Sequence, residues 1–113
     1  MRLFGAALCA AMLSLASTAH ASNASAGKIS GILSFGNGGV VFFNHDGDRS
    51  TLPGCPGVQP TRWAIDSSTL AGQGRLAILL SAYSLGKKIE IVGLGTCGLW
   101  SDTETVNYFV IKD

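Results

Sequence analysis

Few residues of this chain are of the types that carry out catalysis, and they are not spaced for it. After residue 21 the only histidine is His45, which lies in the polar string Asn-His-Asp-Gly-Asp. A histidine base needs a nucleophile and an orienting partner within reach. Neither a G-x-S-x-G turn nor an H-E-x-x-H pair occurs. We therefore expect His45 to be an exposed turn residue and the protein not to be an enzyme.

The same polar string offers alternating oxygen ligands at Asn44, Asp46 and Asp48. A calcium loop of the EF-hand type needs glycine at its sixth position and glutamate at its twelfth. Arg49 and Cys55 stand at those positions. We therefore expect a solvated turn here, and neither a metal nor a cofactor.

Binding chemistry is better supplied than catalysis. Trp100 follows a glycine-rich stretch, and an exposed loop tryptophan can stack on a sugar ring while its N–H donates. The alternative is that Trp100 packs over a disulfide. Asp102 and Glu104 either border a sugar site or solubilise a loop, and Asp66 is expected to cap a helix.

The first 21 residues are expected to be a secretory signal peptide rather than part of the fold. Arg2 supplies the positive end, residues 3–15 are apolar but too short to span a bilayer, and Ala19-His20-Ala21 fits a small-x-small cleavage site. Residues 22–113 would then be one secreted or periplasmic domain. No later stretch is long and apolar enough for a membrane span.

Net charge argues against a nucleic-acid partner. The chain has eight Lys and Arg against seven Asp and Glu, and Arg2 falls in the expected signal peptide. The remaining charges balance, and the only cationic pair is Lys87-Lys88. Phosphate binding needs clustered cations.

The two cysteines that follow the signal peptide, Cys55 and Cys97, are expected to form a disulfide. An even cysteine count in a small exported domain is typical of such a bridge. Closing a loop of this length contributes roughly 4 kcal/mol in the chain-entropy account.

Alternating and short apolar runs, separated by glycine, proline and polar turns, predict five strands and one helix. The expected strands are 28–35, 40–44, 62–65, 88–94 and 103–112, and the expected helix is 68–85, after a loose leader at 22–26. This order is that of a mainly β, five-stranded OB-type barrel with the helix between strands three and four. A flat mixed α+β sheet is the alternative.

Alternation within the first expected strand separates two faces. Ile29, Leu33 and Phe35 would point inward. The outward face would carry Lys28, Ser30, Ile32 and Ser34. An apolar Ile32 between two serines is unusual for a solvated face, so a ligand or a partner is expected there.

The expected helix is apolar around more than half of its circumference. Leu76, Leu79, Leu80 and Tyr83 form one stripe, and a second stripe lies beside it. A surface helix of a small domain needs one apolar stripe, so we expect the other to be covered by a second copy of the chain. The alternative is that the Cys55 loop covers it.

Short motifs distributed along the chain resemble those of one family. They are Gly27-x-x-Ser30-Gly31, Cys55, Trp63-Ala64, Leu79-Leu80-x-Ala82 and Lys88-x-x-Ile91 before Cys97. With them the chain resembles small exported bacterial proteins related to the B subunit of subtilase cytotoxin and the binding subunit of typhoid toxin.

The resemblance implies an OB-type barrel in a homopentamer whose helices line the centre of the ring. It also implies lectin activity toward sialylated glycans, a toxin A subunit as a partner, and a sialic acid contact at the position of Ser30. Ile32 would then face a neighbouring subunit. An acidic residue that the subtilase subunit has four positions before that serine is Ala26 here.

These arguments give a glycan-binding, lectin-like, secreted subunit as the expected function. The predicted site comprises Ser30, Lys28, Ser34 and the more distant Trp100, and the predicted oligomer interface comprises Leu76, Leu79, Leu80 and Tyr83. The alternative is a periplasmic interaction or inhibitor module that uses the apolar helix and binds no sugar.

Overall fold

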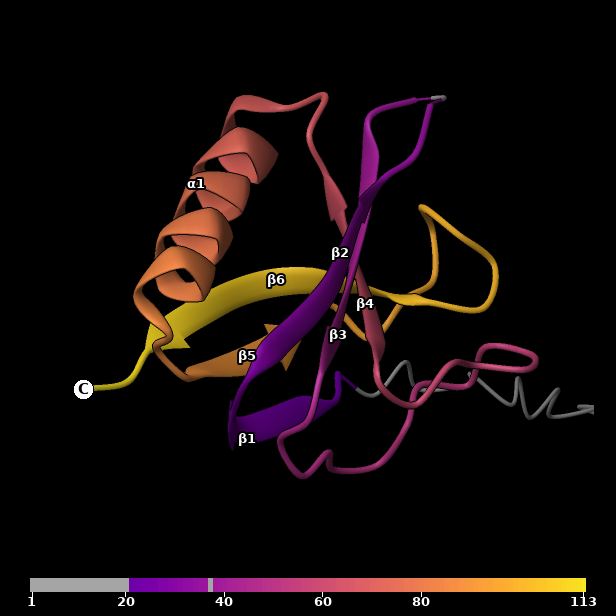
Figure 1. Cartoon of the computed structure of the whole chain (residues 1–113). Coiled ribbons are helices and arrows are strands. Elements are labelled where there is room, and N and C mark those ends of the chain that lie inside the picture. The colour runs from indigo at the N-terminus through magenta and orange to yellow at the C-terminus, as the bar shows by residue number, and fades with distance from the viewer. Residues whose placement is uncertain (1–20, 37) are drawn as a thin grey trace, which may run out of the picture.

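The computed structural model describes residues 21–36 and 38–113, and nearly all of the expected signal peptide lies outside them. Over these described residues the fold is mainly β with one helix (Figure 1). Its elements are β1 (Asn23–Gly27), β2 (Ile29–Ser34), β3 (Val40–His45), β4 (Arg62–Asp66), α1 (Leu70–Leu85), β5 (Ile89–Gly93) and β6 (Glu104–Ile111).

The strands form one six-stranded sheet in the order β1-β5-β6-β4-β3-β2. Neighbours are antiparallel except β4 and β6, which are parallel. The prediction of five strands is therefore wrong, because the sheet has six. With one additional strand before it, the helix lies between the fourth and fifth strands, β4 and β5, rather than between the third and fourth. The two ends of the strand order, β1 and β2, are separated in the chain by Lys28 alone.

The additional strand is β1, which we expected to be a loose leader. Its sequence, NASAG, has little intrinsic preference for a strand. It forms because its backbone pairs with β5, with Ala24 opposite Ile91 and Gly27 opposite Ile89. Pairing with a distant strand has overridden a weak local signal.

The main core lies between α1 and one face of the sheet, where α1 contacts β2, β4 and β6. The largest fully buried apolar side chains are Phe43, Trp63, Ile65, Leu79, Ile89, Ile91 and Val106. A second cluster lies on the opposite face of β3, where Val40, Phe42 and Ala64 pack under Leu99 and Trp100. This opposite face is called the outer face below.

A bulge in β2 changes which side chains face the core. Ser30 pairs with Asn44 and Leu33 pairs with Phe42, so β2 has one residue more than β3 between these pairs. Gly31 has a φ of 57°, which a glycine adopts without strain. Beyond the bulge Ile32, rather than Leu33, packs against the core.

The helix begins later than predicted and has a different N-cap. Thr69, rather than the expected Asp66, accepts a hydrogen bond from the Gly72 N–H at 2.9 Å. Asp66 instead accepts from the Ser68 N–H, at 3.0 Å, and from its hydroxyl. The predicted end of the helix at residue 85 is confirmed, since the next residue, Gly86, is left-handed and its N–H reaches the carbonyls of the last turn.

The predicted disulfide between Cys55 and Cys97 is confirmed, with the two Cα atoms 6.2 Å apart. It joins the loop between β3 and β4 to the loop between β5 and β6, and Trp100 lies in the second of these loops. No helix among the described residues is long and apolar enough to cross a membrane.

Candidate functional site on the outer face

Two rows of side chains run across the outer face of β2, β3 and β4. Residues that pair directly across neighbouring strands share a face. Ser30 pairs with Asn44, which pairs with Arg62, and these three form the polar row. The next row is apolar and runs from Leu33 through Phe42 to Ala64.

Gly31 allows the polar row to be compact. A Cβ atom at Gly31 would lie 2.7 Å from the Asn44 side-chain amide nitrogen. The Asn44 amide therefore lies against the backbone of the bulge, next to exposed Ser30. Thr61 donates from its hydroxyl to the Asn44 side-chain oxygen at 3.3 Å. A hydroxyl and an amide side by side are typical partners for a sugar hydroxyl or carboxylate.

Arg62 is held in place at the end of the polar row. Its Nη2 donates to Asp102 at 2.6 Å and its Nε donates to the Thr103 hydroxyl at 2.9 Å. The guanidinium lies 4.8 Å from the centre of the Phe42 ring. Both members of the Arg62–Asp102 ion pair are about one third exposed, so they border the face while remaining in contact with water.

The pKa of the Asp102 carboxyl is held below its ordinary value. Its partial burial by itself acts in the opposite direction and raises the pKa. The hydrogen bond from Thr103 and the positive charge and hydrogen bond of Arg62 outweigh that effect. Asp102 is therefore a carboxylate that orients Arg62, rather than a proton donor.

An aromatic cluster adjoins the apolar row. The Trp100 ring lies edge-on to Phe35 and to Phe42, with centroids 4.9 and 5.2 Å apart. Phe35 and Phe42 are 6.3 Å apart in the same manner. Phe35 and Leu33 were both expected in the core, but they are 39% and 53% exposed because the bulge reverses their direction.

The structure brings together some of the predicted site residues and separates others. Ser30 lies on the outer face with Phe42, which contacts Trp100. Ser34 pairs with Val41, a residue of the main core, so its side chain belongs to the opposite face and the prediction that it accompanies Ser30 is wrong. Ile32 packs against the chain's own core, which corrects the expectation that it faces solvent or a neighbour.

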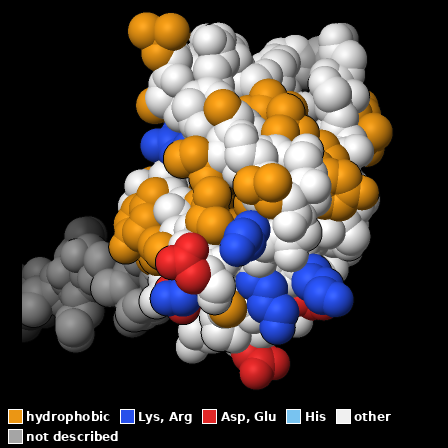
Figure 2. Space-filling view, turned by 60° about the vertical axis from the view of Figure 1, so that its left-hand side comes forward, with side chains coloured by type: hydrophobic (Ala, Val, Ile, Leu, Met, Phe, Trp, Pro, Cys, Tyr) orange, Lys and Arg blue, Asp and Glu red, His pale blue; other side chains and the backbone are white. Residues whose placement is uncertain are grey.

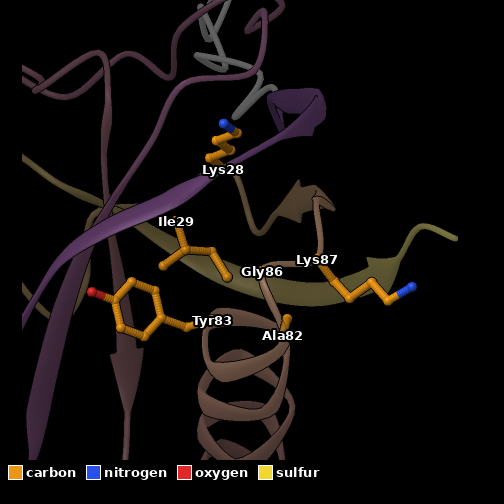
Figure 3. Close-up of a pocket in the computed structure, with 6 residues that line it drawn as sticks. All are labelled: Lys28, Ile29, Ala82, Tyr83, Gly86 and Lys87. Atoms are coloured by element: carbon orange, nitrogen blue, oxygen red, sulfur yellow. The ribbon is translucent and has the colours of Figure 1, made fainter.

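Lys28 lies directly before β2, two residues ahead of Ser30. It lines a hollow of about 240 Å³ between the C-terminal end of α1 and the β1–β2 junction, together with Ile29, Tyr83 and Lys87. In Figure 3 the two lysine side chains extend away from the Tyr83 ring and from each other. The hollow is therefore not a paired-lysine anion site.

Asn44 and Arg62 were missed as site residues. Asn44 was placed where an expected strand meets a polar turn and Arg62 at the start of the next expected strand, and neither was given a binding role. A signal was present, because each flanks a short apolar run and so occupies the end of a strand, where the alternation continues. Their side-by-side placement depends on the pairing of β3 with β4, which no local pattern shows.

Two buried polar residues also differ from the expectations but lie outside this site. His45 is buried, its Nε2 lies 2.8 Å from the Ile89 carbonyl, and its Nδ1 accepts from the Gly47 N–H at 3.3 Å. Burial lowers its pKa despite that carbonyl and nearby Asp46. Glu104, expected to be in a loop, is fully buried and bound to Arg49 at 2.7 Å.

No group of three or more His, Cys, Asp or Glu side chains that could hold a metal ion occurs in the described part of the chain. Comparisons with protein-family models, with curated proteins and with solved structures found no match to this chain.

Proposed function

We propose that the outer face of β2, β3 and β4 binds a carbohydrate and that the protein is a lectin-like binding subunit without enzymatic activity. The observation that carries the proposal is the polar row of Ser30, Asn44 and Arg62 beside a solvent-reaching aromatic cluster. A sugar ring presents hydroxyl groups, which the polar row can bind, and an apolar C–H face, which the aromatic cluster can contact.

The resemblance of the short motifs to toxin B subunits supports a sialylated glycan as the ligand class. Arg62 already pairs with Asp102, so the sialic acid carboxylate would be bound by the Ser30 hydroxyl and the Asn44 amide. Phe35 and Trp100 would contact the apolar face of the sugar. This assignment replaces Lys28 and Ser34 in the predicted site with Asn44 and Phe35.

The first test is a glycan array with Ser30→Ala. We expect its glycan signal to fall roughly tenfold, because one hydrogen bond to a charged group contributes about 1.5 kcal/mol or more. Ser25→Ala is the matched control, since Ser25 is an exposed strand serine in β1. A full signal from Ser30→Ala would contradict the placement of the site.

The finer fold assignment is also a proposal. If β1 and β2 are taken as one strand bent at Lys28, the strand order closes on itself and the connectivity is that of an OB-type barrel with the helix after its third strand. Two features support it: only one residue separates β1 from β2, and β4 and β6 are parallel. Such a fold does not by itself carry a function.

We further propose that the outward face of α1 packs against other copies of the chain, in the ring of five that the resemblance implies. Arg75 is the helix's only charged residue, and its Nε is engaged by the Asn107 carbonyl. Leu70 and Leu85 are 87% and 71% exposed. Figure 2 shows hydrophobic side chains across the upper part of the side that carries α1, with charged side chains gathered below.

The predicted interface is corrected by this geometry. Leu79 is fully buried in the chain's own core and Leu76 packs against that core, because both face the sheet. Leu80 and Tyr83 are about half exposed and remain candidates, joined by Ile78, Leu70 and Leu85.

The same exposed helix face favours a second candidate function, a periplasmic interaction or inhibitor module that binds another protein. The two functions differ in solution mass, which light scattering measures across a dilution series. A stable homo-oligomer supports the lectin-like subunit. A monomer that captures a different protein and gives no array signal supports the interaction module.

A further inference from the structure

The first residue of β6 carries a buried carboxylate. Glu104 is fully buried, and its two oxygens accept four hydrogen bonds. Oε1 accepts from Arg49 at 2.7 Å and from the Ser22 hydroxyl, and Oε2 accepts from the Gly95 N–H at 2.9 Å and the Ser22 N–H at 3.2 Å. Half of these bonds therefore come from one residue, Ser22.

Arg49 connects this carboxylate to the rest of the fold. Its Nε donates to the Ser22 hydroxyl at 3.0 Å, and its Nη1 donates to the carbonyls of Gln59 and Pro60 at 3.1 and 2.8 Å. Its guanidinium also lies 3.9 Å from the centre of the Trp63 ring. The Arg49 guanidinium therefore interacts with several partners and not with Glu104 alone.

Ser22 marks the point at which the chain enters the folded body. Ser22 is fully buried, whereas Ala21 before it is exposed. The Ser22 carbonyl accepts from the Gly93 N–H at 2.9 Å, which begins the pairing of β1 with β5. The Ser22 nitrogen is therefore fixed against the carboxylate, and the next bond toward the N-terminus reaches solvent.

We propose that Ser22 is a processing site whose newly formed α-ammonium group pairs with the Glu104 carboxylate. Water adds across the Ala21–Ser22 peptide bond, Ala21 departs with the new carboxyl group, and Ser22 keeps the nitrogen as an amine that takes up a proton. The hydrolysis requires a peptidase of the export machinery. It precedes the burial of Ser22, because the folded chain covers that residue.

The chemistry of the site suits this change. Processing converts an amide donor, already 3.2 Å from Oε2, into a charged donor, and charge-assisted hydrogen bonds are about twice as strong as neutral ones. The charged groups that face Ser22 are Glu104 from β6 and Arg49 from the loop after β3. The pairing of Ser22 with Glu104 does not depend on carbohydrate binding.

The test uses the full chain, exported by a bacterial host and collected after processing. Intact mass identifies the N-terminus, which we expect at Ser22. The folded and urea-unfolded proteins are then acetylated briefly at pH 7, and the modified peptides are quantified. An ordinary α-amino group has a pKa of about 8, against about 10.4 for lysine, so it reacts first.

In the folded protein we expect that order to be inverted. The Ser22 α-amine should react at least roughly tenfold more slowly than exposed Lys28, Lys87 and Lys88, because its proton is held by a buried carboxylate. In urea it should again react first. Chains that begin at another residue, or a Ser22 amine that reacts ahead of the lysines in the folded state, would overturn the proposal.

A variant pair gives a second readout. Glu104→Gln keeps the shape of the side chain and removes its charge, so a folded variant should show a Ser22 amine that reacts several times faster. Glu90→Gln is the matched control, since Glu90 pairs with Lys112 at 3.4 Å on the exposed surface. Equal protection of Ser22 in Glu104→Gln and Glu90→Gln would also overturn the proposal, and the wild-type labelling decides the matter if Glu104→Gln does not fold.

Discussion

Gly93 leaves the space that the Glu104 carboxylate occupies. A Cβ atom at this position would lie 1.8 Å from Oε2 and 2.9 Å from the Trp63 ring. We expect Gly93→Ala to lower the free energy of unfolding by about 3–5 kcal/mol, because it displaces a buried carboxylate from its partners. Urea denaturation of the oxidised protein measures the change.

Gly74→Ala is the matched control for that substitution. Gly74 lies in the middle of α1, and a Cβ atom there meets no other atom within 4 Å. Alanine should raise the free energy of unfolding by about 0.5–1 kcal/mol, since it removes the entropic penalty of a helical glycine. Similar losses from both substitutions would mean that the space at Gly93 is not the cause.

His45 should make stability depend on pH. Burial holds the pKa of folded His45 below the value of about 6.5 expected in the unfolded chain. Below pH 6.5 the unfolded chain therefore binds more protons than the folded chain, so stability falls as the pH drops from 6.5 toward the folded pKa. Above pH 6.5 this contribution is constant.

The measurement is the urea midpoint of the wild type and of His45→Gln between pH 8 and pH 5. We expect the wild type to lose stability over this range more steeply than the variant, which cannot titrate at that position. Parallel curves would show that another group is responsible. Glutamine is chosen because it can still donate to the Ile89 carbonyl.

At the scale of the elements, local patterns predicted most of the fold. Alternating and short apolar runs located β2 through β6, and Gly86 follows the predicted end of α1. The elements that were missed depend on distant partners. β1 has a weak strand sequence and exists because it pairs with β5, and the β2 bulge at Gly31 became visible only from its register with β3.

The candidate site was predicted only in part, because it too depends on pairing between distant strands. Ser30 and Trp100 were named from residue type and location, whereas Asn44 and Arg62 join them only through the pairing of β2, β3 and β4. Ser34 was misplaced because one extra residue in a strand moves every following side chain to the other face. Glu104 was misjudged because its partner Arg49 is far away in the sequence.

The disulfide joins the loop that carries Trp100 to the loop that follows β3. Cys55 lies in the loop after β3, and Cys97 lies in the loop that also carries Trp100. Replacing both with alanine should lower the free energy of unfolding by about 4 kcal/mol, because the unfolded chain regains the entropy of a long open loop. Urea denaturation measures this, and near-ultraviolet circular dichroism should show a weaker Trp100 signal at concentrations of urea where the variant is still folded. An unchanged spectrum would mean that packing on Phe35 and Phe42 alone holds the loop.

At the scale of the whole molecule, weak sites and self-association are connected in the proposed function. One shallow outer face binds a sugar with limited affinity, and several copies presented on one side of an assembly raise the effective affinity by a factor of about 10²–10⁴. Carbohydrate binding on a surface should therefore depend on the outward face of α1 as well as on Ser30.

Leu80→Lys tests this connection. Leu80 is 44% exposed on α1, so a lysine there should leave the core intact while placing a charge in an apolar contact between copies. We expect light scattering to show a monomer, and binding to a glycan-coated surface to fall by roughly a hundredfold or more. Ligand titration by NMR, which detects single sites, should give an unchanged affinity.

Ser84→Lys is the control for an added charge on α1, because Ser84 is exposed and already polar. If Leu80→Lys is monomeric and still binds the surface as tightly as the wild type, multivalency does not contribute to binding, and the exposed apolar face of α1 requires a different partner.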